Sequence, residues 1–461
     1  MDIVVIGGGP GGYVAAIAAA KRGAQVVLIE KDMVGGTCLN RGCIPTKAIL
    51  HSANLFAEAK NFAEIGIKIS EPEIDFATIM QRKSAVVKQL RGGVEFLLKK
   101  AGVKVIKGDA SFVSEKEIKV CGAEGEHTIE FENAIIATGS APADLPFAKA
   151  DGETIINSNH ALELNKLPES VVVIGGGVVG CEFAQAFARL GSKVTIVEML
   201  PDLIANMEKE QSEILKRVLK RDKIDINLSC KVNIVTAMSC GGEVKFTDCN
   251  GEQKTVTAEK ILIATGRRPM SAELDLEAAG VVAAADGSVK VNEYCATEVQ
   301  GIYAIGDVAG SVQLAHVASH QGIIAVSNIF KEQKSLDERI IPYCIYTNPE
   351  IASMGLSEEK AKEQGYIPKT GLFPTSANGR SIIEGMKDGF SKIVADTSDG
   401  TILGIHLVGA NVTEMISPLS GVIKFEATLE DVTEMIFAHP TVSEIIHESV
   451  LDADKKAIHI P

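Results

Sequence analysis

One pattern occurs twice in the chain, and it constrains the fold more than any other feature of the sequence. Each copy has an apolar strand, a glycine-rich turn, a helix of small apolar residues, and a second strand that ends in an acid. The glycines follow the spacing G-x-G-x-x-G and are Gly7, Gly9 and Gly12 in the first copy and Gly175, Gly177 and Gly180 in the second. The acids are Glu30 and Glu198, each 23 residues after the first glycine of its copy. Such a unit binds a dinucleotide pyrophosphate at the helix N-terminus and a ribose at the acid. The sequence therefore predicts an α/β fold with two Rossmann-like dinucleotide-binding domains.

The rest of the chain divides around these two units. A related strand closes each copy, at 135–139 and at 261–266. Apolar residues at helical spacing predict helices at 48–62 and 76–101, and shorter alternating runs predict strands near 104–119 and 128–132. From residue 341 the pattern becomes α+β, with antiparallel strands at 391–395 and 401–408 joined by a turn at Asp399 and Gly400. The expected boundaries are 1–145 and 268–340 for the first domain, 146–267 for the second, and 341–461 for the end domain.

The composition excludes several classes of function. The 461 residues suffice for two to four domains with cores of their own. A formal net charge of −14 argues against binding to nucleic acid or to an anionic membrane. Residues 3–20 carry no charge, but glycines and Pro10 interrupt them, so we interpret them as neither a membrane span nor a signal sequence. Nine cysteines spread over the chain do not resemble the disulfide framework of a secreted protein, and we expect a cytoplasmic location.

Two cysteines stand out because of their setting in G-G-T-C-L-N-R-G-C-I-P-T-K, residues 35–47. In a regular helix, residues five apart are about 8–9 Å apart at Cα, whereas a disulfide needs Cα atoms within roughly 7 Å. If Cys38 and Cys43 pair, the backbone must turn between them, at Gly42, and a helix would begin at Ile44 or Pro45. Its N-terminus would favour a thiolate. The spacing alone leaves open whether the two are a working dithiol or small buried apolar residues.

The residues around the cysteines favour the working dithiol. Gly35, Gly36 and Thr37 precede them, and Lys47 follows Cys43 by one helical turn. The stretch resembles the redox motif of the class I pyridine-nucleotide disulfide oxidoreductases, most closely that of the members that oxidise dihydrolipoamide. The resemblance implies a redox-active disulfide in which Cys38 is the interchange thiol and Cys43 lies against a flavin. It also implies that Lys47 lies at the flavin and pairs with Glu182, which could otherwise be an ordinary first-turn acid.

A second catalytic candidate is His439, in the sequence H-P-T-V-S-E. A helix opening at Ser443 places Glu444 about one turn on, where its carboxylate can hold the imidazole, fix its tautomer and raise its basicity. The motif is similar to the C-terminal motif of the same family. There it reaches the dithiol of the other subunit, which implies a homodimer. His316 and His320 are four apart and could bind a metal, but no third ligand has suitable spacing, and we predict no metal site.

The resemblance also implies which cofactor each unit binds. The first unit, together with the later Gly306-Asp307, would bind FAD tightly, one per subunit, although Asp307 could also be a helix N-cap. The expected FAD contacts are Gly7, Gly9, Gly12, Glu30, Gly36, Thr37, Lys47, Ala110, Thr138, Gly139, Asp307 and Ala315. The second unit would bind a nicotinamide dinucleotide, through Gly175, Gly177, Val178, Val179, Gly180, Glu198, Val232 and Gly266. Because residues 199–207 hold no Lys or Arg to bind a 2′-phosphate, Glu198 favours NAD over NADP.

The function implied by the resemblance is FAD-dependent oxidation of protein-bound dihydrolipoamide to lipoamide, with reduction of NAD to NADH. NAD use argues against relatives similar to glutathione reductase, and the chain end D-A-D-K-K-A-I-H-I-P lacks the cysteine pair expected of mercuric reductase. The implied partners are a second copy, lipoyl domains, and the peripheral subunit-binding domain of an acyltransferase or a glycine-cleavage H protein. The alternatives are another disulfide reductase of the family, or a chain that serves mainly as a docking subunit of such an assembly.

Overall fold

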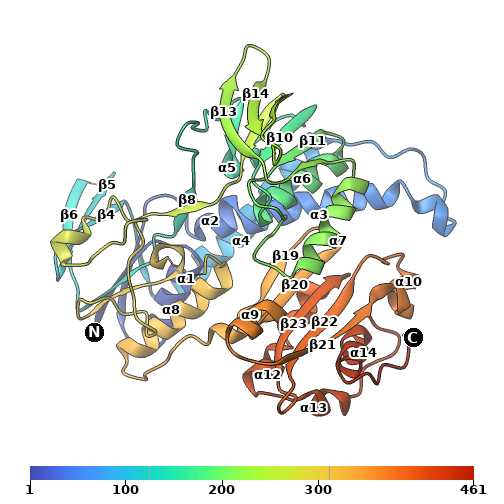
Figure 1. Cartoon of the computed structure of the whole chain (residues 1–461). Coiled ribbons are helices and arrows are strands. Elements are labelled where there is room, and N and C mark those ends of the chain that lie inside the picture. Colours follow the sequence, from blue (N-terminus) through green and yellow to red (C-terminus); the bar gives the residue numbers. More distant parts are fainter. Residues whose placement is uncertain (124, 311, 461) are drawn as a thin grey trace.

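The computed structural model describes residues 1–123, 125–310 and 312–460 (Figure 1). The first domain is built on a parallel five-stranded sheet, ordered β18-β7-β1-β2-β3. Its strands are β1 (Asp2–Ile6), β2 (Gln25–Glu30), β3 (Lys104–Lys107), β7 (Asn133–Ile136) and β18 (Ile302–Ala304). Because β18 comes from beyond the second unit, the chain leaves this domain and returns to it. Helices α1 (Pro10–Lys21) and α8 (Ala315–Ile329) pack closely, since a Cβ on Gly322 would lie 2.6 Å from the Gly11 carbonyl oxygen.

The second domain repeats this plan. Its parallel sheet has the order β12-β11-β10-β16-β9. The strands are β9 (Ile155–Asn157), β10 (Ser170–Ile174), β11 (Lys193–Val197), β12 (Asp225–Asn227) and β16 (Lys260–Ile263), and the helices are α5 (Ser158–Ala161), α6 (Val178–Leu190) and α7 (Lys209–Arg221). The two Rossmann-like domains predicted from the glycine fingerprints are therefore confirmed.

Each closing strand follows a three-stranded antiparallel sheet in the chain. These sheets are β4 (Asp109–Ser114), β5 (Glu117–Gly122) and β6 (Gly125–Glu130) in the first domain, and β13 (Lys231–Ala237), β14 (Gly242–Thr247) and β15 (Gln253–Ala258) in the second. The segments after the two closing strands, β8 (Ser140–Pro142) and β17 (Arg267–Pro269), pair with each other in antiparallel fashion. This pair joins the two domains at the carboxyl ends of their sheets, where α/β folds bind ligands.

The end domain is an antiparallel sheet covered by short helices. The sheet has the order β19-β20-β23-β22-β21. Its strands are β19 (Tyr343–Ile345), β20 (Glu350–Gly355), β21 (Pro368–Pro374), β22 (Phe390–Asp396) and β23 (Ile402–Gly409), and the helices are α9 (Glu358–Glu363), α10 (Gly379–Ile383), α11 (Val412–Ile416), α12 (Ser420–Lys424), α13 (Leu429–Thr433) and α14 (Glu444–Ala453). The hairpin β22–β23, with Asp399 and Gly400 between its strands, confirms the expected pairing. Helix α14 lies so close to β21 that a Cβ on Gly371 would meet the Ser449 carbonyl oxygen at 2.0 Å.

The cysteine segment differs in part from the expectation. Cys38 lies in a short helix, α2 (Gly36–Arg41), and α3 (Cys43–Ala59) begins at Cys43 rather than at Ile44 or Pro45. Gly42 separates the helices with φ −147° and ψ −114°, so the expected turn is present as a break between two helices. The Asn40 amide donates at 3.0 Å to the carbonyl oxygen of Val34, which holds α2 against the preceding loop, and at 3.0 Å to that of Gly36, the first residue of α2.

The remaining elements follow the sequence pattern closely. The long helix α4 (Phe76–Lys100) matches the expected helix at 76–101. Strand β18 ends at Ala304, because the chain turns into a 3-10 helix at Gly306. The 3-10 segments are η1 (Phe62–Ile65), η2 (Leu276–Ala279), η3 (Gly306–Ala309), η4 (Glu338–Ile340) and η5 (Thr375–Ala377). Within the described ranges, the chain forms no helix with the length and apolar character needed to traverse a bilayer.

Candidate active site

The two glycine turns have the same geometry. Gly7 and Gly175 have φ values of 101° and 113°. A Cβ on Gly12 would lie 1.8 Å from the Gly7 carbonyl oxygen, and a Cβ on Gly180 would lie 2.0 Å from that of Gly175. Only glycine therefore allows the helix to begin this close to the strand. The backbone N–H groups in the first turn of each helix can then face an anion.

The two acids also occupy matching positions. Glu30 accepts hydrogen bonds from the N–H groups of Gly8, at 2.6 Å, and of Asp32, at 2.8 Å. Glu198 accepts from Gly176 and, at 2.7 Å, from Leu200. Burial raises the pKa of Glu30 above its ordinary value, although the bond from Gly8 lowers it. Each carboxylate is thus fixed beside its glycine turn, where the ribose of a bound dinucleotide would lie.

A cavity of about 1310 Å³ extends from Glu30 to the cysteine pair. This exceeds the roughly 300–1,000 Å³ of ordinary ligand pockets. Of the expected FAD contacts, all except Gly12 line it: Gly7, Gly9, Glu30, Gly36, Thr37, Lys47, Ala110, Thr138, Gly139, Asp307 and Ala315. The lining also includes Cys38, Cys43 and Glu182.

The cavity fits FAD in its lining as well as in its size. A Cβ on Gly36 would lie 2.6 Å from Gly9 Cα, so the backbones of the first glycine turn and of the start of α2 are in close contact. This part of the cavity wall therefore consists of backbone without side chains. Glu30 and the dithiol line the same cavity, as an extended dinucleotide with a redox-active ring requires.

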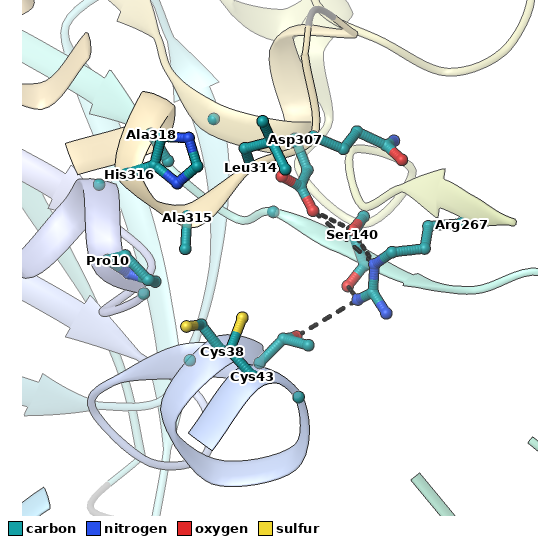
Figure 2. Close-up of a pocket in the computed structure, with 18 of the residues that line it drawn as sticks. Pro10, Cys38, Cys43, Ser140, Arg267, Asp307, Leu314, Ala315, His316 and Ala318 are labelled. Carbon is teal, nitrogen blue, oxygen red and sulfur yellow. Dashed lines mark hydrogen bonds and ion pairs between the residues drawn. The ribbon is translucent and has the colours of Figure 1, made fainter. Parts of the chain in front are cut away.

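Cys38 and Cys43 lie side by side, and their sulfur atoms point into the cavity in Figure 2. Both are free thiols in this structure, which therefore represents the dithiol form. The pKa of Cys43 is lowered to about 7, because a hydrogen bond from the Cys38 thiol and the nearby Lys47 ammonium together outweigh the effect of burial. The same bond, followed by burial, raises the pKa of Cys38. The pair is therefore polarised so that Cys43 is the thiolate.

The expected pairing of Lys47 with Glu182 is present. The Lys47 ammonium donates to both carboxylate oxygens of Glu182, at 2.9 and 2.6 Å. Glu182 is only 2% exposed, and it also accepts a hydrogen bond of 3.0 Å from the Tyr346 backbone N–H. Sequence reasoning did not identify Tyr346, because nothing near it in the chain forms a recognisable motif.

His439 and Glu444 form the expected pair, but away from the cavity. His439 Nδ1 lies 2.9 Å from Glu444 Oε1, and the Thr441 N–H donates to the other carboxylate oxygen at 2.9 Å. Burial raises the pKa of Glu444, but these two bonds outweigh it and hold the value below its ordinary range. The His439 side chain is 78% exposed, and neither residue lines the cavity. Within one chain, the structure therefore does not bring this pair to the dithiol.

Two of the expected NAD contacts line the cavity, and the others lie elsewhere in the second domain. Val178 and Val179, at the start of α6, line the cavity, so the second dinucleotide unit opens onto the dithiol side. Val232 is partly buried against an apolar cluster of the second domain. The others, outside the cavity lining, are Gly175, Gly177, Gly180, Glu198 and Gly266.

A polar cluster that sequence reasoning missed joins β8 and β17, the segments after the two closing strands. Ser140 Oγ donates to Asp307, and Arg267 Nε donates to Ser140 Oγ at 2.7 Å (Figure 2). Arg267 also reaches the Ser140 carbonyl oxygen at 2.7 Å and Thr37 Oγ1 at 3.5 Å. Ser140 and Arg267 each follow an Ala-Thr-Gly closing sequence. Alignment of the two repeats would therefore have identified both residues.

Together, these features define an oxidoreductase that transfers electrons between a dithiol and two dinucleotides. Residues 1–322 match the family model described as pyridine nucleotide-disulphide oxidoreductase, and residues 341–450 match that of its dimerisation domain. The chain belongs to the pyridine nucleotide-disulphide oxidoreductase family. Membership implies FAD and NAD(H) as the two dinucleotides, and it identifies the end domain as a dimerisation domain.

Curated relatives match the whole chain. A dihydrolipoyl dehydrogenase from Bacillus subtilis (strain 168) is 41% identical over 466 residues, 100% of both chains. A mitochondrial dihydrolipoyl dehydrogenase from Pisum sativum is 40% identical and covers 100% of this chain and 92% of its own. Among solved structures, LpdA from Mycobacterium tuberculosis has a TM-score of 0.91 at 28% identity, over 98% of this chain and 99% of its own.

Proposed function

We propose that the chain is an FAD-dependent dehydrogenase that oxidises protein-bound dihydrolipoamide and reduces NAD to NADH. The observation that carries this proposal is the placement of a polarised Cys38–Cys43 dithiol, with the Lys47–Glu182 pair, in the wall of the FAD-sized cavity. Identity of about 40% to dihydrolipoyl dehydrogenases over the full length supports the choice of substrate.

The residues of the chain have complementary roles in this reaction. His439 accepts a proton from one substrate thiol, and the resulting thiolate attacks Cys38 of the disulfide form, so that Cys43 leaves as a thiolate. The second substrate thiol then displaces Cys38, which releases lipoamide and leaves the enzyme as a dithiol. When bound, FAD supplies the two-electron acceptor that connects this dithiol to NAD. The Lys47 ammonium stabilises the Cys43 thiolate, and Glu182 fixes that ammonium in place.

The base in this scheme comes from a second copy of the chain. Because His439 lies outside the cavity of its own chain, we infer that the dimerisation domain carries it to the dithiol of the partner copy. The domain boundaries that we propose remain 1–145 with 268–340, 146–267 and 341–461. Glu198 is oriented to accept the ribose hydroxyls of NAD.

The further partners are proteins that carry or dock the substrate. We propose lipoyl domains and either an acyltransferase peripheral subunit-binding domain or a glycine-cleavage H protein, in the cytoplasm. A net charge of −14 would steer a basic docking domain toward the dimer.

The test measures NADH formation from dihydrolipoamide by the purified holoenzyme. We expect Cys38→Ser to lower this rate by more than about 10³-fold, because the substrate thiolate has no disulfide to attack. Cys240→Ser is the matched control, since Cys240 is exposed and lies outside the cavity lining. Retained NADH formation in Cys38→Ser would refute the proposal. Reduction of glutathione disulfide by NADPH at a higher kcat/KM would instead support a glutathione-reductase-like function.

A further inference from the structure

Tyr346 lies against the Lys47–Glu182 pair from a different part of the chain. It follows β19 of the dimerisation domain and lines the same cavity as the dithiol. Its ring centroid is 4.6 Å from the Lys47 ammonium nitrogen, which is within the range of a cation–π interaction. Its backbone N–H donates to the carboxylate of Glu182. One residue therefore contacts both members of the ion pair.

The backbone around Tyr346 is fixed to helix α6. Glu182, Gln185 and Arg189 occupy one face of this helix. Gln185 forms two hydrogen bonds with the Asn348 backbone, donating to its carbonyl at 3.0 Å and accepting from its N–H at 2.7 Å. Arg189 donates to the same carbonyl at 3.0 Å. With the bond from Tyr346 to Glu182, these contacts hold the segment 346–348 along α6.

The charge of Cys43 depends on groups from four elements and from the segment that follows β19. Cys38 of α2 donates a hydrogen bond to it, and the Lys47 ammonium of α3 favours its thiolate, while the Glu182 carboxylate of α6 disfavours it. Arg267 of β17 and Tyr346 also face Cys43. Burial raises the pKa of Tyr346 to about 12, so its hydroxyl stays neutral beside the thiolate. Of these groups around Cys43, the Lys47 ammonium is the one that the Tyr346 ring contacts directly.

We propose that Tyr346 is a positioning residue for the dithiol, because its ring keeps the Lys47 ammonium, and its backbone amide keeps the Glu182 carboxylate, beside Cys43. The dimerisation domain then contributes to thiolate formation within its own chain, apart from any residue that it supplies to a second copy. This inference rests on the proposed role of Cys43 as the thiolate of the dithiol form.

The test is a pH titration of the Cys43 thiolate in the holoenzyme. The readout is the long-wavelength absorbance of the two-electron-reduced enzyme, recorded anaerobically, which a thiolate beside the flavin produces. In Tyr346→Leu the backbone amide remains but the ring is lost. Lys47 then moves toward water, and the midpoint shifts upward by roughly 0.4–0.7 pH units, the equivalent of an exposed cation–π contact.

Two further variants separate the ring from other effects. Tyr346→Phe keeps the ring and should titrate within about 0.2 pH units of the unaltered enzyme. Tyr366→Leu, at a 40% exposed tyrosine outside the cavity lining, controls for a general effect of this substitution and should leave the midpoint unchanged. Thermal unfolding of each variant verifies that it is folded.

The outcomes separate this inference from the proposed function. If the unaltered enzyme gives no thiolate absorbance at any pH, the proposed function fails. If it does, and Tyr346→Leu titrates at the same midpoint, only the inference about Tyr346 is overturned. An equal shift in Tyr346→Phe would also overturn it, because the effect would then belong to the hydroxyl.

Discussion

Replacement of Glu444 by glutamine should remove the catalytic base while leaving the rest of the enzyme intact. Glu444 accepts a hydrogen bond from the Thr441 N–H and faces His439 Nδ1 at 2.9 Å. With the carboxylate present, the imidazole carries its proton on Nδ1 and leaves Nε2 free as a base. In Glu444→Gln the amide oxygen retains the Thr441 bond, so the amide N–H group faces Nδ1. Nδ1 must then accept a hydrogen bond, and the proton moves to Nε2.

The magnitude follows from the loss of general-base catalysis. A base in the wrong tautomer lowers the catalysed rate by about 10²–10⁴-fold. We therefore expect kcat/KM for dihydrolipoamide oxidation to fall by that factor. Oxidation of NADH by ferricyanide, which needs no proton transfer from a thiol, should change by less than about twofold. Glu434→Gln, at an exposed acid after α13, is the matched control. A loss of less than about fivefold, or equal losses in both assays, would refute the reasoning.

Three other predictions follow from the charges of the structure. The Lys392 side chain is 4% exposed, and its ammonium contacts Glu208, Glu210 and Glu358 at 3.0, 2.8 and 3.3 Å. Lys392→Met should therefore lower the free energy of unfolding, measured by urea titration, by about 3–5 kcal/mol. A loss no greater than that caused by Lys387→Met, at an exposed lysine, would contradict this prediction. Glu198 should favour NAD over NADP by about 10²-fold in kcat/KM, and Glu198→Ser should reduce that ratio; equal rates in the unaltered enzyme would defeat the argument. Hydrogen bonding by Arg339, aided by Lys424, lowers the pKa of Asp337 to about 2, so its stabilising effect is present above about pH 4 and is lost as the pH falls through 2. Asp337→Asn should thus lower Tm at pH 7 but not at pH 2, and an equal loss at both would show that charge is not the cause.

Local patterns in the sequence predict the parts of the site that lie close together in the chain. The glycine spacing predicts the turns, because only glycine fits where a Cβ would meet a carbonyl oxygen, as at Gly12 and Gly180. His439 and Glu444 are five residues apart, and their contact follows from a turn before α14, in which Glu444, the first residue of the helix, accepts from the Thr441 N–H and faces His439. The Lys47–Glu182 pair was expected only through the family resemblance, since 135 residues separate its members.

The remaining parts depend on tertiary structure and have no local pattern. Tyr346 reaches the dithiol because Gln185 and Arg189 fix the segment 346–348 on α6, and neither side of that contact is recognisable in the sequence. No helix was expected before the turn at Gly42, but Cys38 lies in α2, which Asn40 stabilises through the carbonyl groups of Val34, in the preceding loop, and of Gly36, the first residue of α2. Such hydrogen bonds override weak local propensity.

Helix α6 connects the second dinucleotide unit to the dithiol. Its first turn belongs to the second glycine fingerprint, with Gly177 as its N-cap, and Val178 and Val179 line the cavity. One turn further along α6, Glu182 forms an ion pair with Lys47 of α3. At the C-terminal end of α6, Arg189 donates a hydrogen bond of 2.7 Å to Asn54, which also lies in α3. Because α3 starts at Cys43, these two contacts fix the register between the thiolate and the nicotinamide unit. The alignment needed for electron transfer is therefore set by one helix–helix interface rather than by a mobile loop.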